Sequence, residues 1–118
     1  MTSKLFVYGT LKKGFYNHHW LPKDSKFLGA GYVTGFEMRS NGGFPYTFPE
    51  MDGTIFGELY EVSDLKSCDT LEGYPHHYTR SIVMVHQVPN ITEAWMYHVT
   101  DEMRDRNLYQ LIDDGVWR

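Results

Sequence analysis

The segment of residues 26–61 constrains the fold most strongly, because it combines strand-forming side chains with a high density of glycine. Phenylalanine, tyrosine, valine and isoleucine recur along it. Glycine within strands marks bulges, bends and close backbone approaches. Seven glycines interrupt the segment: Gly29, Gly31, Gly35, Gly42, Gly43, Gly53 and Gly57. We therefore predict short, bent antiparallel strands, of which residues 54–62 form the clearest.

Further strands are predicted on both sides of this segment. Residues 4–8 are aromatic and β-branched up to Gly9, which predicts a short buried strand that runs into a tight turn. Residues 78–88 and 92–99 alternate again and meet at Pro89-Asn90, which predicts a hairpin.

Two short helices complete the predicted secondary structure. The first runs from Ser63, a residue type that caps helix N-termini, to about Glu72, just before Gly73. Its apolar residues fall at helical spacing: Leu65, Cys68 and Leu71. The second is predicted near the C-terminus, with Thr100 or Asp101 as its cap and Gly115 as its end. Its apolar stripe is Met103, Leu108, Leu111 and Ile112.

Many short strands with two small helices define an α+β fold. At 118 residues the chain has the length of one domain, so we expect residues 1–118 to form a single domain. We expect its sheet to curl into a small mixed β-barrel with the two helices on its flanks.

Charge and cysteine content exclude several classes of partner. The formal net charge of −4 provides no basic surface for nucleic acid. No apolar run reaches the length of a membrane span, so we expect no membrane partner. The single cysteine cannot form an internal disulfide, and no secretory leader opens the chain, so we expect a cytoplasmic location. The sequence does not indicate an oligomeric state.

Aromatic residues make up 16% of the chain, a share that suits a sheet whose rings line a core or a pocket. Composition leaves both interpretations open. The same choice is open for Tyr78 and Tyr97 individually.

The turn after the first predicted strand is the first candidate for chemistry. It consists of Tyr8, Gly9, Thr10 and Leu11, and we call it the 8–11 turn. A glycine-containing strand end can direct successive backbone N–H groups into one space and bind an anion there. An ordinary turn without function is the alternative. The residues that follow lack the Gly-Lys-Ser/Thr ending of a phosphate-binding loop.

Glu72 is the second candidate, because it lies at a predicted chain reversal between Leu71 and Tyr74. Partial loss of water at such a position raises the pKa of a carboxyl group towards the range useful for proton transfer. A solvated glutamate at a helix end is the alternative.

Metal and cysteine chemistry have weaker support. Adjacent histidines occur at residues 18–19 and 76–77, but neighbouring side chains point apart and do not form a ligand set. We therefore expect no metal and no other cofactor. Cys68 falls on the apolar side of its helix, where a thiol is usually an inert small hydrophobe, and a Cys–His nucleophile is the alternative.

Several motifs together resemble one known family. Residues 6–14 (Phe-Val-Tyr-Gly-Thr-Leu-Lys-Lys-Gly), followed by Asn17-His18, resemble the N-terminal signature of the γ-glutamylcyclotransferase-like family, especially its γ-glutamylamine cyclotransferase (AIG2-like) branch. Residues 57–62 (Gly-Glu-Leu-Tyr-Glu-Val) and 69–75 (Asp-Thr-Leu-Glu-Gly-Tyr-Pro), with Tyr78 and Arg80, follow in the family's order. Residues 94–97 and 115–117 are similar to its short microbial members. One departure is Cys68, where leucine is common.

The resemblance implies a function as well as a fold. It implies a mixed β-barrel with a pocket at one end, in which the 8–11 turn binds a γ-glutamyl group and Glu72 is the general acid and base. The substrate would be a small γ-glutamyl amine or peptide, and the products 5-oxoproline and a free amine. A non-catalytic module that binds a small metabolite on the same fold is the alternative. The sequence does not identify the amine.

Overall fold

The computed structural model describes residues 2–99 and 105–118. Helix α1 (Lys66–Glu72) and two short 3₁₀ helices, η1 (His18–Trp20) and η2 (Arg106–Leu108), accompany a six-stranded sheet. The strands are β1 (Ser3–Val7), β2 (Lys26–Ser40), β3 (Pro45–Val62), β4 (Thr79–Gln87), β5 (Asn90–His98) and β6 (Gln110–Ile112).

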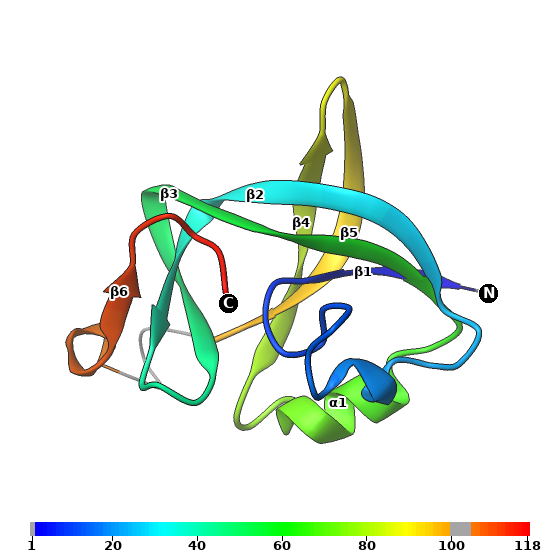
Figure 1. Ribbon diagram of the computed structural model, residues 1–118, viewed down its shortest axis with the longest axis horizontal. Coiled ribbons are helices and arrows are strands. Elements are labelled where there is room, and N and C mark those ends of the chain that lie inside the picture. The colour runs from blue at the N-terminus through cyan, green and yellow to red at the C-terminus, as the bar shows by residue number, and fades with distance from the viewer. Residues whose placement is uncertain (1, 100–104) are drawn as a thin grey trace.

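The glycine-rich segment forms one long antiparallel hairpin, β2 and β3, which spans the molecule in Figure 1. Its register shifts twice, and Gly29 and Gly35 lie at these shifts with positive φ angles of 109° and 90°. The predicted bends are therefore confirmed. The prediction of short strands is wrong, because the bulges bend β2 and β3 without ending them.

The strand pairings form a ring that curls the sheet. The order is β3-β1-β5-β4-β2, and β2 pairs again with β3. Two junctions in this ring are narrow: β1 and β5 pair in parallel at Leu5 and Trp95, and β2 and β4 pair at Tyr32 and His86. The mixed α+β class is confirmed, and the sheet is strongly curled but not evenly paired around its circumference.

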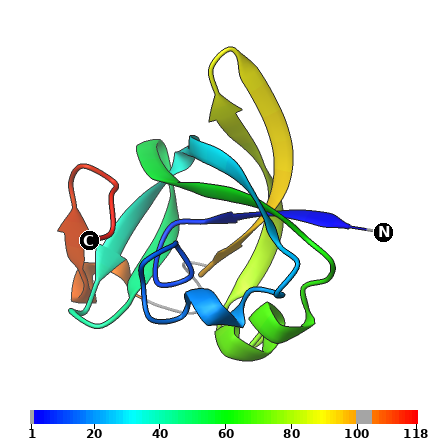
Figure 2. The ribbon, with the colours of Figure 1, turned by 45° about the vertical axis from the view of Figure 1, so that its right-hand side comes forward.

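The predicted β4–β5 hairpin is confirmed. Thr79 pairs with His98 at its base, and Gln87 pairs with Asn90 at its tip. Its tip projects beyond the rest of the sheet, and α1 lies at the opposite end of the molecule (Figures 1 and 2). The strand predicted at residues 4–8 is also confirmed, as β1, whose last three residues, Leu5, Phe6 and Val7, are buried.

Helix α1 ends as predicted but begins differently. Gly73 ends it in the left-handed conformation, with a φ of 65°. The N-cap position belongs to Leu65 and not to Ser63, whose prediction as a cap is wrong. The side chain of Asp64 accepts a hydrogen bond of 2.9 Å from the backbone N–H of Lys66. Asp64 is one residue nearer than Ser63 and so satisfies a free donor of the first turn.

The prediction of a second α-helix is wrong for the described part of that segment, which forms η2 and β6. The unpaired edge of β2 supplies backbone partners for β6, and Met38 pairs with Ile112. Leu108 and Leu111 are 78% and 42% exposed, so they do not form the expected buried stripe. Thr100, Asp101 and Met103 lie outside the described residues. In residues 2–99 and 105–118 no helix is long and apolar enough to cross a membrane.

Candidate functional site

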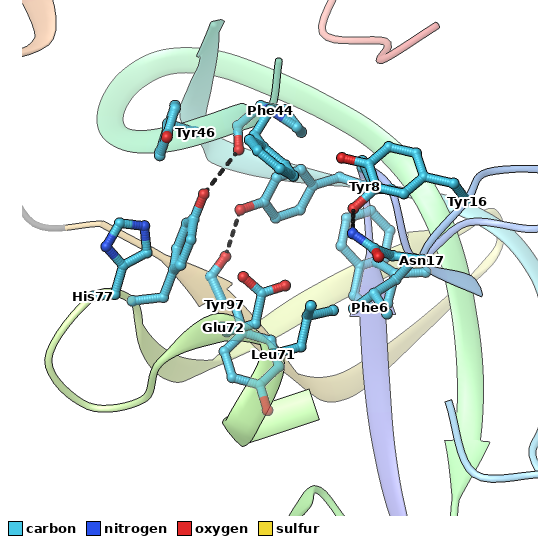
Figure 3. A pocket seen from close by; sticks show the side chains of 16 residues that line it. Phe6, Tyr8, Tyr16, Asn17, Phe44, Tyr46, Leu71, Glu72, His77 and Tyr97 are labelled. Carbon is cyan, nitrogen blue, oxygen red and sulfur yellow. Dashed lines mark hydrogen bonds between the residues drawn. The ribbon is translucent and has the colours of Figure 1, made fainter. Parts of the chain in front are cut away.

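A pocket of about 320 Å³ opens where the end of β1, the turn between β2 and β3, and the end of α1 meet (Figure 3). It is lined by Phe6, Val7, Tyr8, Gly9, Thr10, Leu11, Tyr16, Asn17, Phe44, Pro45, Tyr46, Leu71, Glu72, His77, Tyr78 and Tyr97. The structure thus brings the whole 8–11 turn and Glu72 into one cavity. It also places both tyrosines left open by the sequence, Tyr78 and Tyr97, in the wall.

The 8–11 turn is buried and braced by the chain that follows it. Asn17 makes two hydrogen bonds to Thr10: its backbone N–H donates to the carbonyl oxygen at 3.1 Å, and its side-chain Nδ2 donates to Oγ1 at 2.9 Å. A Cβ atom at Gly9 would lie 2.5 Å from Cγ of Pro45. Glycine is therefore required here by a close approach to the opposite pocket wall.

The backbone N–H groups of Gly9, Thr10 and Leu11 find no acceptor among the residues that the structure describes. More than nine in ten buried backbone N–H groups in native proteins have a partner. Three successive donors without a protein partner beside a cavity can bind the oxygen atoms of a ligand. This arrangement favours the anion-binding interpretation over an ordinary turn.

Tyr8 holds the turn against the neighbouring strands. Its hydroxyl donates to the carbonyl oxygen of Tyr97 at 2.8 Å and accepts from Oγ1 of Thr47 at 3.1 Å. Burial, with a smaller contribution from the negative charge of Glu72, raises the pKa of Tyr8 far above its usual value. The phenol therefore stays neutral and cannot act as the base.

Glu72 is the last residue of α1, and its carboxylate points into the pocket in Figure 3. The side chain is partly buried, and within the described residues it has no hydrogen bond or ion pair. Burial raises the pKa of Glu72 from 4.5 to about 7. A carboxyl group in this state gains and loses a proton near neutral pH, as a general acid and base must. Glu72 is therefore part of the pocket wall and not a solvated helix end.

A polar network behind the pocket fixes α1 and was not predicted from the sequence. Asp69 accepts a hydrogen bond of 2.5 Å from the Tyr97 hydroxyl and forms an ion pair with Arg80, with 2.9 Å between Oδ1 and Nε. The guanidinium of Arg80 lies 4.5 Å from the ring centroids of both Tyr74 and Trp95. The network ties the helix that carries the pocket carboxylate to β4 and β5. All three residues stand in the motifs quoted above, but these motifs are separate in the sequence and do not show that Asp69, Arg80 and Tyr97 meet.

The other candidates do not form sites in the described residues. These hold no cluster of three or more histidine, cysteine, aspartate or glutamate side chains that could bind a metal. His18 lies 2.8 Å, through Nδ1, from the carbonyl oxygen of Leu11 and so braces the turn. Burial raises the pKa of the Cys68 thiol to about 12. The inert interpretation of Cys68 is therefore favoured over a nucleophile.

The fold is thus a strongly curled mixed sheet with one pocket in its described part that combines the 8–11 turn with a partly buried carboxylate. Residues 5–118 match the family model described as "Gamma-glutamyl cyclotransferase, AIG2-like". The chain therefore belongs to the γ-glutamylcyclotransferase family, which confirms the resemblance seen in its motifs.

Individual relatives agree with this assignment. The chain is 40% identical over 97 residues to a Methanocaldococcus jannaschii protein named "Putative gamma-glutamylcyclotransferase", covering 79% of this chain and 81% of that one. It is 30% identical over 116 residues to the γ-glutamylcyclotransferase family protein YtfP of Escherichia coli, covering 97% and 95%. The fold is similar to that of an AIG2-like protein from Mus musculus, with a TM-score of 0.81, 22% identity, and coverage of 95% and 86%.

Proposed function

We propose that residues 1–118 act as one enzymatic domain, which cyclises a γ-glutamyl amine or peptide to 5-oxoproline and releases the free amine. The observation that carries this proposal is the placement of Glu72, with its pKa raised to about 7, in the same pocket as the 8–11 turn, three of whose N–H groups have no acceptor among residues 2–99 and 105–118. Membership of the family supports the same reaction class.

The reaction needs no nucleophile from the protein. The α-amino nitrogen of the glutamyl group attacks its own side-chain carbonyl carbon, and a five-membered ring closes. The bond from that carbon to the amine nitrogen then breaks. The enzyme must therefore hold the substrate folded, and well-oriented intramolecular attack is worth about 7 to 11 kcal/mol relative to a bimolecular reaction.

Glu72 supplies the proton transfers in this scheme. As a carboxylate it takes a proton from the attacking nitrogen, and as a carboxylic acid it returns that proton to the departing amine. A pKa of about 7 leaves substantial amounts of both forms at neutral pH. It also lies close to the value of about 8 for an α-amino group, so neither transfer is strongly uphill.

The N–H groups of Gly9, Thr10 and Leu11 bind the γ-glutamyl group and stabilise the oxyanion of the tetrahedral intermediate. A single well-placed oxyanion donor contributes about 3 to 4 kcal/mol in other enzymes. Backbone donors suit this role because the braced turn holds them in place before the substrate arrives.

The test is a turnover assay on the purified protein with γ-glutamyl-ε-lysine and a set of other γ-glutamyl amines. We expect release of 5-oxoproline, measured by chromatography and mass spectrometry. The variant Glu72→Gln should lose release and keep its circular dichroism spectrum. Glu93→Gln, which changes an exposed carboxylate on β5, is the matched control and should turn over normally.

Two outcomes contradict the proposal in different ways. Full turnover by Glu72→Gln would remove the assigned acid and base. Ligand-induced thermal stabilisation without turnover of any substrate would instead support the non-catalytic binding module.

A further inference from the structure

Two exposed aromatic side chains meet at the mouth of the pocket. Tyr16 is 61% exposed and Phe44 is 44% exposed, yet both line the cavity. Their ring centroids are 6.2 Å apart with an interplanar angle of 59°. In the view of Figure 3 they lie across the pocket from Leu71 and Glu72. Neither ring belongs to the buried core, so the core does not account for them.

The backbone on each side of this aromatic pair is held in place. Tyr16 directly precedes Asn17, which is bonded to Thr10 in the 8–11 turn. Phe44 closes the turn between β2 and β3, where the Ser40 hydroxyl donates to its carbonyl oxygen at 3.0 Å. Contact surfaces that are positioned before a ligand binds cost less entropy on binding.

The size of the pocket indicates which part of a substrate reaches the pair. A volume of about 320 Å³ lies at the lower end of the range for ligand pockets, about 300 to 1,000 Å³. In the proposed function the γ-glutamyl group lies inside, between the 8–11 turn and Glu72. The amine portion then extends outwards to the mouth, where Tyr16 and Phe44 lie.

We propose that Tyr16 and Phe44 form the subsite for the leaving amine and select amines that carry an aromatic group. This inference rests on the proposed function and adds a substrate class to it. Two tilted rings offer an apolar surface against which a third ring gains edge-to-face or offset stacking in addition to its burial. The bonds that change are those of the amide carbon and nitrogen. The aromatic group of the amine therefore contributes to binding and not to the chemical step.

The experiment compares γ-glutamyl benzylamide with γ-glutamyl ethylamide, which lacks the ring. Dissociation constants are measured by calorimetry on Glu72→Gln, and kcat/KM is measured by 5-oxoproline release on the unchanged protein. We expect the dissociation constant of the benzylamide to be about tenfold lower than that of the ethylamide, and its kcat/KM to be about tenfold higher. Stacking and burial of one ring provide a preference of this size.

Variants at the mouth show whether the pair causes the preference. Tyr16→Ala and Phe44→Ala should each reduce the ratio of the benzylamide value to the ethylamide value, and the double variant should bring this ratio to about one. Tyr16→Phe keeps the ring and should keep the preference. Phe27→Ala is the matched control, because Phe27 is 57% exposed on β2 and does not line the pocket.

Each outcome separates this inference from the proposed function. Equal binding of both amides, or a preference that survives in the double variant, overturns the subsite even if 5-oxoproline is released. A ring preference in binding without any turnover supports the subsite and contradicts the cyclotransferase. Tighter binding of γ-glutamyl-ε-lysine than of the benzylamide, lost in Phe44→Ala, would assign the pair to a cation and overturn the inference. Binding of neither amide overturns both proposals.

Discussion

Replacing Glu72 by glutamine should stabilise the protein above neutral pH while removing its activity. The folded protein holds the carboxyl group with a pKa of about 7, compared with 4.5 for the free group. Between these values the native state keeps a proton that the unfolded chain has released. Stability therefore falls as pH rises through this interval, and the full penalty is present above pH 7.

The magnitude follows from the shift. A rise from 4.5 to about 7 corresponds to roughly 3 kcal/mol at about 1.4 kcal/mol per pKa unit. Glutamine carries no charge at any pH and so never incurs this penalty. The free energy of unfolding of Glu72→Gln should match that of the unchanged protein near pH 4.5 and exceed it by roughly 3 kcal/mol at pH 8.

Urea unfolding at several pH values between 4.5 and 8 measures this difference. With a typical m-value of about 1 to 3 kcal/mol/M, the midpoints should separate by about 1 to 3 M at pH 8. Titration of all other groups affects both proteins alike and cancels in the comparison. Glu93→Gln, at an exposed position, should show no such divergence. A difference between Glu72→Gln and the unchanged protein that is the same at every pH would refute the argument that burial perturbs this carboxyl group.

Three further predictions follow from the pocket and its supports. Gly9→Ala places a Cβ atom 2.5 Å from Cγ of Pro45, so the 8–11 turn must shift. We expect kcat/KM to fall by at least about tenfold, while the circular dichroism spectrum stays that of a folded protein. Unchanged kinetics would show that the turn does not position substrate. Cys68, buried with its thiol pKa raised to about 12, should resist a thiol reagent at pH 8 until urea unfolds the chain, and rapid labelling of the native protein would contradict its placement in the core. Arg80→Ala removes two hydrogen bonds to Asp69 and should lower the free energy of unfolding by about 1.5 to 3 kcal/mol, whereas an unchanged urea midpoint would show that the pair does not stabilise α1.

Local signals predicted much of the fold. The apolar run before Gly9 and the glycine after Glu72 each mark an element boundary that the structure contains, and the hairpin turn predicted at Pro89-Asn90 lies one residue earlier, at Val88-Pro89. They succeeded because each depends on the conformational preferences of a few neighbouring residues. The length of β2 and β3 was missed because a glycine such as Gly35 occurs both in a bulge within a continuous strand and in a turn that ends a strand. The local sequence is the same in the two cases.

The C-terminal segment failed for a different reason. Helical spacing at residues 108–112 was outweighed by the free edge of β2, which offers β6 backbone partners far away in the sequence. The network of Asp69, Arg80 and Tyr97 was missed likewise, because its members come from α1, β4 and β5. No window along the chain reveals such a contact.

The sequence by itself determined the chemical parts of the candidate site: a glycine turn after a strand, and a glutamate between apolar neighbours. It could not decide whether these parts meet. Only the tertiary structure places the end of α1 beside the end of β1, because the curled sheet and the Asp69 network bring both to one cavity. That placement buries Glu72 in the same pocket as the 8–11 turn, whose N–H groups find no acceptor in the described part of the chain, and so turns two ordinary local features into a candidate active site.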